Sequence, residues 1–433
     1  MGFASYRGVG LVVCLALASL SNAQGESLAD AWRMALQNDA SIGAARSDVE
    51  AAEEDRNAAS RSRFPVLEAN GSYAQFKKAP SLDVATPAGA LQARIWKHDG
   101  YAAGSVDVSV PIWTSGRISG AIGAANAGLD GARAQQSRST ADVKLAVAEC
   151  YIAVFRTRRM LAVAESNVAS LRANAEDIGV MYDKESVPKS DLLAAKVALS
   201  NAEQQRMRAA HALRLAQAAY NRQVGQPLDR TVELEEPAAK ESVATGEPLE
   251  RMTTLALERR PEFAALQAQR EALGQQARAE RAQALPQLAL RAGYNHFESE
   301  ILDRQNFASV GVGFQWRLFD SGQIAARPSA LRGRARAVDQ RWADLRSLIS
   351  LEVETAVLNR DDAAARVRAA GEAVEQAEEN LRSTRELYGS GLATNTQVLD
   401  AESLRVRALS NRDDARFDLL IAGYRIERAV GDL

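Results

Sequence analysis

Hydrophobic positions along the chain follow two different periods, and the same order of periods occurs twice. Over 147–182, apolar or small residues recur at alternating steps of four and three, beginning with Val147, Tyr151 and Val154. The same spacing recurs over 353–388. Alternating steps of this kind are typical of helices that pack along a coiled-coil seam. The pattern predicts one very long helix per copy, roughly 66 residues or about 100 Å at about 1.5 Å per residue.

Each long helix is expected to turn and run back beside itself. Tips are predicted at 183–189, around Pro188, and at 389–395, where Gly389 and Gly391 interrupt the helical pattern. A further helix of about 35 residues is expected before each hairpin, over 27–63 and 248–284. Each copy therefore combines one helix with one long antiparallel helical hairpin.

Between the first helix and the hairpin of each copy, the period changes from 3.6 to 2. Four segments alternate apolar with polar residues, at about 66–76, 104–113, 287–297 and 307–318. Strands of this length with one apolar face are typical of transmembrane β-barrels, although a half-buried sheet in a soluble domain gives the same alternation. The charged residues of the polar faces are the candidate lining of a water-filled lumen: Glu68, Asp107, Arg291 and Arg317.

Four strands cannot close a barrel, and an open sheet edge in lipid leaves backbone groups unpaired. Other chains must therefore complete the barrel. Eight strands would enclose a lumen filled by side chains, whereas twelve would leave an aqueous opening. The charged polar faces fit water better, so a homotrimer is the most economical solution.

The two copies are tandem repeats. Tyr182 and Tyr388 are equivalent, which gives an offset of 388 − 182 = 206 residues, and Ser115-Gly116 falls on Ser321-Gly322 at the same offset. The division that follows is a signal peptide at 1–23, a first repeat at 24–225, a charged linker at 226–247 and a second repeat at 248–433.

The N-terminus predicts export. Val9 to Leu20 is an apolar run too short to span a bilayer, and Ser21-Asn22-Ala23 has the small-x-small form of a cleavage site. Cys14 lies inside the apolar run, so the chain is not expected to be lipidated. Cys150 is then the only cysteine of the mature chain, and no intrachain disulfide can form.

Composition argues against several classes of function. The net charge is −2 with no basic cluster, which excludes a nucleic-acid-binding surface. The three histidines lack ligand spacing with Cys150, and no phosphate-binding loop is present, so we expect no metal, no cofactor and no enzymatic activity.

The duplicated order of elements resembles the TolC-like outer membrane efflux proteins over essentially the whole mature chain. In each copy a Pro-x-Leu strand is followed by a strand that leads into aromatic-x-Ser-Gly and then the long hairpin. The second hairpin also matches the family's tip pattern, at Tyr388, Gly391, Val398, Leu399 and Ala401.

The resemblance implies a mainly α-helical fold with transmembrane β structure. Duplicated hairpins would form an α-barrel across the periplasm, below a trimeric twelve-stranded β-barrel in the outer membrane of a Gram-negative bacterium. Expected partners are a periplasmic adaptor (membrane fusion) protein, an inner-membrane pump of RND or ABC type, and outer-membrane lipid. The linker 226–247 resembles part of the family's equatorial domain.

The resemblance also implies roles for residues at the tips. The periplasmic gate is expected at Asp400, Gln397, Tyr388, Asp191 and Ser190, with Asp191 and Ser190 hydrogen-bonding to the Tyr388 hydroxyl. Gln397 replaces a common acidic residue, and Ala393 an arginine, so the family's closure network is not expected intact. The adaptor is expected to dock on Lys184, Glu185, Val187, Gly391 and Leu392.

The function implied is a passive duct in a tripartite export system, for small molecules or, alternatively, for secreted polypeptides. Two other classes also carry long helical hairpins. A periplasmic adaptor would have lipoyl-like and small β-barrel segments around one hairpin, and a soluble coiled-coil protein would lack the period-2 segments at matching places in both copies.

Overall fold

The computed structural model describes residues 25–87, 89–96, 98–237 and 247–433. The expected signal peptide and the cysteine considered for lipidation lie outside these residues. Among the helices described, none is both long and apolar enough to cross a membrane.

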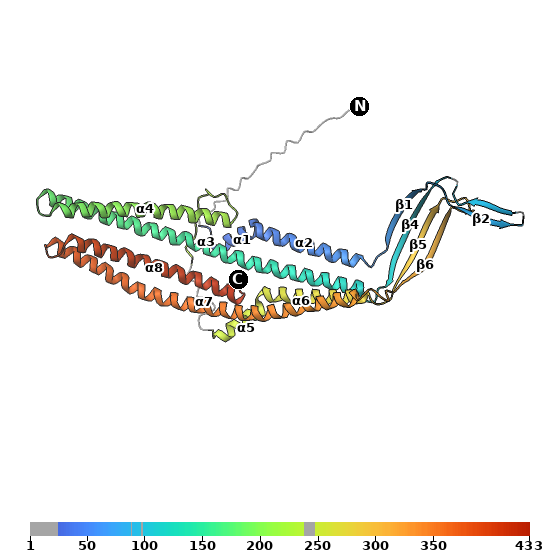
Figure 1. The fold of residues 1–433 in the computed structure, drawn as a ribbon. Helices are drawn as coiled ribbons and strands as arrows, with labels where there is room; N and C mark the ends of the chain where they lie inside the picture. The colour runs from blue at the N-terminus through green and yellow to red at the C-terminus, as the bar shows by residue number, and fades with distance from the viewer. Residues whose placement is uncertain (1–24, 88, 97, 238–246) are drawn as a thin grey trace, which may run out of the picture.

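The chain is an elongated molecule with a sheet at one end and two helical hairpin tips at the other (Figure 1). The helices of the first repeat are α1 (Leu28–Asn38), α2 (Ala40–Arg61), α3 (Arg117–Asp183) and α4 (Lys189–Gln223). Those of the second repeat are α5 (Leu249–Arg259), α6 (Pro261–Ala282), α7 (Gln323–Gly389) and α8 (Asn395–Val430). The two long helices, α3 and α7, have 67 residues each.

The helix expected before each hairpin is in fact two helices, so the single-helix prediction was wrong. In the first repeat Asp39 ends α1 and caps α2, since its carboxylate accepts hydrogen bonds from the backbone N–H groups of Ser41 and Ile42. In the second repeat Pro261 begins α6 and holds Arg260 in an extended conformation. Both breaks had a local signal in the sequence, an N-capping aspartate and a proline.

Four strands form one antiparallel sheet in the order β1-β4-β5-β6. They are β1 (Val66–Gln75), β4 (Gly100–Trp113), β5 (Gln287–Phe297) and β6 (Asn306–Gln315). The last strand ends earlier than the sequence predicted, because the final β5–β6 pair is Gln287 with Gln315. Arg317 therefore lies beyond the sheet.

The connection between β1 and β4 is longer than the one between β5 and β6, and it folds as a separate two-stranded hairpin that the sequence did not predict. It consists of β2 (Ser81–Thr86) and β3 (Gly89–Arg94), and it extends beyond the end of the sheet (Figure 1). The loop between β5 and β6 contacts the chain after this hairpin, because Ser299 and Glu300 both hydrogen-bond to the carbonyl oxygen of Ile95.

The strand register places the four apolar series on one face. Leu67 lies opposite Val108, Val108 opposite Ala292, and Ala292 opposite Val310. Side chains of this face are exposed along the sheet, at Leu67, Tyr73, Val106, Leu290, Tyr294, Val310 and Val312. An exposed apolar face backed by a polar one is the arrangement that a lipid-facing strand requires.

The same open arrangement of four elements recurs at three levels of the molecule. The sheet has the order β1-β4-β5-β6, the helices nearest to it pack in the order α2-α3-α6-α7, and the hairpins pack as α4-α3-α8-α7. Each level joins two elements from the first repeat to two from the second, and each leaves two outer edges without a neighbour in this chain.

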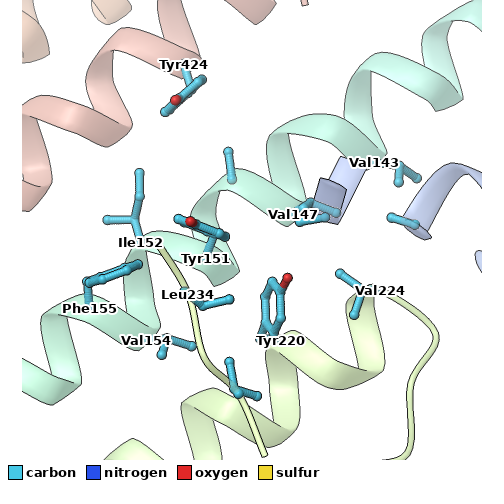
Figure 2. Packing of buried hydrophobic residues seen from close by; sticks show 14 of the residues in the cluster. Val143, Val147, Tyr151, Ile152, Val154, Phe155, Tyr220, Val224, Leu234 and Tyr424 are labelled. Atoms are coloured by element: carbon cyan, nitrogen blue, oxygen red, sulfur yellow. The ribbon is translucent and has the colours of Figure 1, made fainter. Parts of the chain in front are cut away.

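The largest hydrophobic core lies where α1 and α4 meet the middle of α3 (Figure 2). Tyr151 and Tyr220 are fully buried there, and Val232 and Leu234 of the linker pack against them. The linker is further fixed by two backbone hydrogen bonds that join Glu26 to it, one to the carbonyl oxygen of Glu233 and one from the N–H of Glu235. These contacts hold the linker against the middle of α3, which we call the waist of the helical array.

Candidate functional site

Three of the four expected lumen residues share the polar face of the sheet. Glu68 lies opposite Asp107, and Asp107 lies opposite Gly293. Arg291 has the same orientation because it is two residues from Gly293 on the same strand. Arg317 is exposed but follows the end of β6, so the sheet does not orient it.

Glycines on the polar face make room for the charged side chains beside them. A Cβ at Gly293 would lie only 2.4 Å from a carboxylate oxygen of Asp107, and a Cβ at Gly313 would lie 3.3 Å from Nε of Arg291. The other carboxylate oxygen of Asp107 accepts a hydrogen bond of 2.6 Å from Ser105. The polar face thus holds both signs of charge in fixed positions, which suits contact with water.

The two tips differ in their turn chemistry although they are equivalent in the repeat. Gly391 has φ +80° after α7, and Glu185 occupies the equivalent place after α3 with φ +55°. A glycine adopts this left-handed conformation freely, whereas a side chain makes it costly. The expected docking residues Lys184, Glu185, Gly391 and Leu392 are exposed, and Val187 is half-buried.

The Gln397 side chain takes part in the capping box at the N-terminus of α8. Thr394 caps α8, its hydroxyl accepting from the N–H of Gln397, while the Gln397 side-chain oxygen accepts from the N–H of Thr394 at 2.8 Å. Asp400, one turn further along α8, is exposed. Of the two gate positions on this helix, Asp400 is the one whose side chain is free of the capping arrangement.

The hydrogen bond expected at Tyr388 is not formed within the described chain. Its hydroxyl is buried without a partner, and the Ser190 hydroxyl faces Asp191 instead, 3.5 Å from a carboxylate oxygen. Burial, and then the nearby Asp191 carboxylate, raise the pKa of Tyr388. Asp191 is therefore close to Tyr388, although no hydrogen bond joins them in this single chain.

Asn395 joins the two tips instead. It is 2 % exposed, and its amide donates to the backbone oxygen of Asp191 at 3.1 Å. Its side-chain oxygen accepts from Asn174 at 3.5 Å. The one local signal for this contact is weak, a polar residue at the first position of α8.

A second link between the hairpins was also missed from the sequence. Glu402 on α8 is 2 % exposed, and its carboxylate accepts hydrogen bonds from Arg405 at 2.6 Å and from Arg385 at 3.1 Å. Ser170 on α3 donates to the same carboxylate at 2.9 Å. This buried cluster ties the first hairpin to both helices of the second, about two turns from the tip capped by Thr394.

Comparison with known proteins agrees with this architecture. The family model described as "Outer membrane efflux protein" matches residues 253–432. The outer membrane protein TolC of Vibrio cholerae serotype O1 is 30% identical over 166 residues, a match that spans 37% of this chain and 37% of TolC. The resemblance to the TolC-like outer membrane efflux proteins is confirmed.

Solved structures share the fold over nearly the full length. The outer-membrane channel OprN superposes with a TM-score of 0.79 at 18% identity, over 94% of this chain and 90% of OprN. CusC superposes with a TM-score of 0.80 at 16% identity, over 93% of this chain and 92% of CusC. The outer membrane protein VceC from Vibrio cholerae superposes with a TM-score of 0.77 at 17% identity, over 93% of this chain and 96% of VceC. The mainly α-helical fold with duplicated hairpins and four strands per chain is therefore confirmed.

Proposed function

We propose that three copies of this chain form a single exit duct through the outer membrane and across the periplasm. The observation that carries the proposal is the open four-element array at each of the three levels. Three copies would join β6 to the next β1, α7 to the next α2, and α7 to the next α4. Every outer edge would then gain a neighbour, and each level would close with twelve elements.

The two faces of the sheet support this assembly. Closure with the polar face inward would place Glu68, Asp107 and Arg291 on an aqueous lumen, while exposed Leu67, Val310 and Val312 would contact lipid. Similarity of fold to the outer-membrane channel OprN supports a place in the outer membrane. The location that follows is the outer membrane of a Gram-negative bacterium.

The inner end of the duct is proposed to be a gate. Three copies of Asp400 would surround one narrow opening, and a ring of carboxylates attracts cations. Because Gln397 is a neutral capping residue, a single acidic ring would remain there. Asp400→Ala should therefore reduce cation preference in single-channel recording, whereas unchanged selectivity would place the constriction elsewhere.

The exposed tip residues are proposed to dock a periplasmic adaptor, which would couple the duct to an inner-membrane pump. Lys184 and Leu392 offer one charged and one apolar contact at the very ends of the hairpins. Leu392→Asp should weaken binding of the cognate adaptor, while Leu404→Asp, at an exposed leucine on α8 away from the tip, should not.

Small-molecule efflux is the cargo class that we favour, because the matching family model describes efflux proteins. The alternative is an exit duct for secreted polypeptides. Deletion of the gene should raise susceptibility to small toxic compounds without loss of a secreted protein from the medium. The reverse result would favour polypeptide secretion.

Reconstitution of the purified protein tests the duct itself. Native mass measurement in detergent should give three chains, and the same sample should produce discrete conductance steps in a planar lipid bilayer. A stable monomer or dimer that conducts would contradict the shared barrel, because four strands leave open edges in lipid. A trimer that never conducts would contradict the duct.

A further inference from the structure

Four aromatic side chains gather at the end of the sheet that is distant from the helices. The Trp96 ring lies against those of Phe76 and Tyr101, with centroid separations of 5.1 and 5.0 Å. Tyr101 is stacked almost parallel to Trp96, with 13° between the ring planes. Phe297 continues the group, 5.3 Å from Tyr101.

The strand register assigns Tyr101 and Phe297 to the polar face, and Phe76 and Trp96 pack against Tyr101 from the adjoining segments. Tyr101 is six residues from Asp107 on β4, and Phe297 is four residues from Gly293 on β5; even spacing on a strand means the same face. The register between β4 and β5 is unbroken from Ala103 to Pro111. The aromatic group therefore shares its face with the charged row proposed to line the lumen, and not with the apolar row proposed to meet lipid.

The polar face is hollowed beside the rings. A hollow of about 380 Å³ lies over the middle and outer part of the sheet. Asn70, Ser105, Asn295 and Phe307 line it as one row across the polar face, and Phe297 lines it two residues further from the helices. Of the four rings, Phe297 borders this open space, and Tyr101 and Trp96 continue the aromatic surface beyond it.

Backbone hydrogen bonds hold Trp96 in place. The carbonyl oxygen of Ile95 accepts from the hydroxyl of Ser299 at 3.0 Å and from the N–H of Glu300 at 2.9 Å. Ser299 is itself only 4 % exposed. On the next strand, Ala102 donates its N–H to the Glu298 carboxylate at 3.1 Å. The β5–β6 loop thus fixes the backbone beside Trp96 before any ligand arrives, which lowers the entropic cost of binding.

We propose that Phe76, Trp96, Tyr101 and Phe297 form a stacking site for planar aromatic molecules on the lumen wall, near the outer mouth. Each ring is partly exposed, and ring surface left in water is covered favourably by another flat apolar surface. Apart from Phe307, which lies opposite Asn295, the polar-face residues of β5 and β6 between this group and the helices are not aromatic, so a flat molecule would bind at this end of the sheet. The inference rests on the proposed function, because it needs the polar face to be the lumen.

Current block in planar bilayers tests the site. The probe is 9-aminoacridine, a planar aromatic cation, and tetraethylammonium serves as a cation without a flat ring system. Added on the outer side, 9-aminoacridine should interrupt the current at lower concentration than tetraethylammonium. Trp96→Ala should weaken block by 9-aminoacridine at least about tenfold and leave the effect of tetraethylammonium unchanged.

The matched control is Tyr294→Ala, which removes an exposed aromatic ring from the opposite face of the sheet and should leave the block unchanged. If Trp96→Ala fails to assemble, Tyr101→Leu keeps the bulk of the side chain and removes the stacking surface. A conducting wild-type channel that 9-aminoacridine does not block would overturn the inference. So would equal block in wild type and the ring variants, since the rings would then serve packing alone. A wild-type protein that forms no channel refutes the proposed function instead.

Discussion

Glu185 and Gly391 are equivalent residues in the two repeats, and both adopt a left-handed backbone conformation. Glycine adopts this conformation without strain, whereas glutamate does not. Both follow a 67-residue helix with positive φ. Glu185→Gly should stabilise the first tip by about 1 kcal/mol, because the side chain no longer opposes the left-handed conformation. Gly391→Ala should destabilise the second tip by a similar amount. Thermal denaturation of the trimer measures both, and an effect of the same sign for the two variants would contradict the explanation.

Glu402 is the buried acidic residue that links the two hairpins. Glu402→Ala should cost about 2 kcal/mol, because it removes the buried carboxylate that accepts hydrogen bonds from the partly exposed Arg405 and Arg385. Hydrogen exchange in α3 near Ser170 should rise at the same time, since the link to the second hairpin is lost.

An exposed ion pair supplies the control for Glu402. Glu379 pairs with Arg382 on the surface of α7, and Glu379→Ala should leave both stability and exchange unchanged. Equal effects of the two substitutions would mean that burial of Glu402 does not matter to the link.

At the scale of the element, the strand register predicts opposite effects of an arginine on the apolar face and on the polar face of the sheet. Val108→Arg puts a charge on the apolar face and should impair trimer assembly, at a cost of roughly 2–4 kcal/mol near the membrane midplane. Ser309→Arg is the matched substitution on the polar face, in the row of Asp107, and should assemble normally. Gel analysis of unheated outer-membrane samples measures the trimer, and the reverse ranking would mean that the faces are inverted.

Gly313 also lies on the polar face, but Gly313→Arg would be a poorer control than Ser309→Arg. Its Cβ position lies close to the guanidinium of Arg291, so an arginine there would meet a like charge. Loss of assembly in that variant would report local repulsion and would say nothing about which face meets lipid.

At the scale of the whole molecule, a buried ionic cluster joins the two repeats at the waist. Glu262 lies between Arg260 and Arg428, at 2.8 Å from each, and Arg428 also binds Asp142 of α3. Burial raises the pKa of Glu262, but the hydrogen bonds from the two arginines outweigh it and lower the pKa to about 2. The stability that this carboxylate contributes is therefore fully present above its ordinary pKa of about 4.5 and is lost as the pH falls toward 2.

Glu262→Gln should remove that pH dependence. We expect wild type to lose stability between about pH 4.5 and 2 more steeply than the variant, in denaturant titrations at fixed pH. The variant should be less stable than wild type at pH 7, because the arginines lose a charged partner. Parallel curves for the two proteins would show that the carboxylate is not held by the arginines.

Closure of the helical array makes a prediction about the outer helices. Leu215 of α4 and Leu358 of α7 are exposed on the two edges of the hairpin array. Leu358→Asp or Leu215→Asp should reduce the trimer fraction, at about 2 kcal/mol of lost burial per interface. Leu404→Asp is the control, since α8 already has neighbours on both sides in its own chain. A greater loss of trimer with Leu404→Asp would contradict the proposed order of helices.

The sequence alone determined the features that depend on local pattern. The 3-4 spacing that begins at Val147 fixes a long helix, and the alternation around Val108 fixes a strand with two unlike faces, because side-chain direction follows the local backbone period. Repetition at an offset of 206 residues implied that both repeats share one architecture. The tips around Glu185 and Gly391 were likewise predictable, since a turn is a property of a few consecutive residues.

Only the tertiary structure decided which distant segments meet. Pairing of β4 with β5 joins the repeats within one sheet, and it depends on an approach between residues nearly 200 apart. The burial of Glu402, the contact of Asn395 with Asp191 and the position of Trp96 over Tyr101 have the same origin. A single residue's chemistry does not reveal its partner across the fold; packing of whole elements brings the partners together.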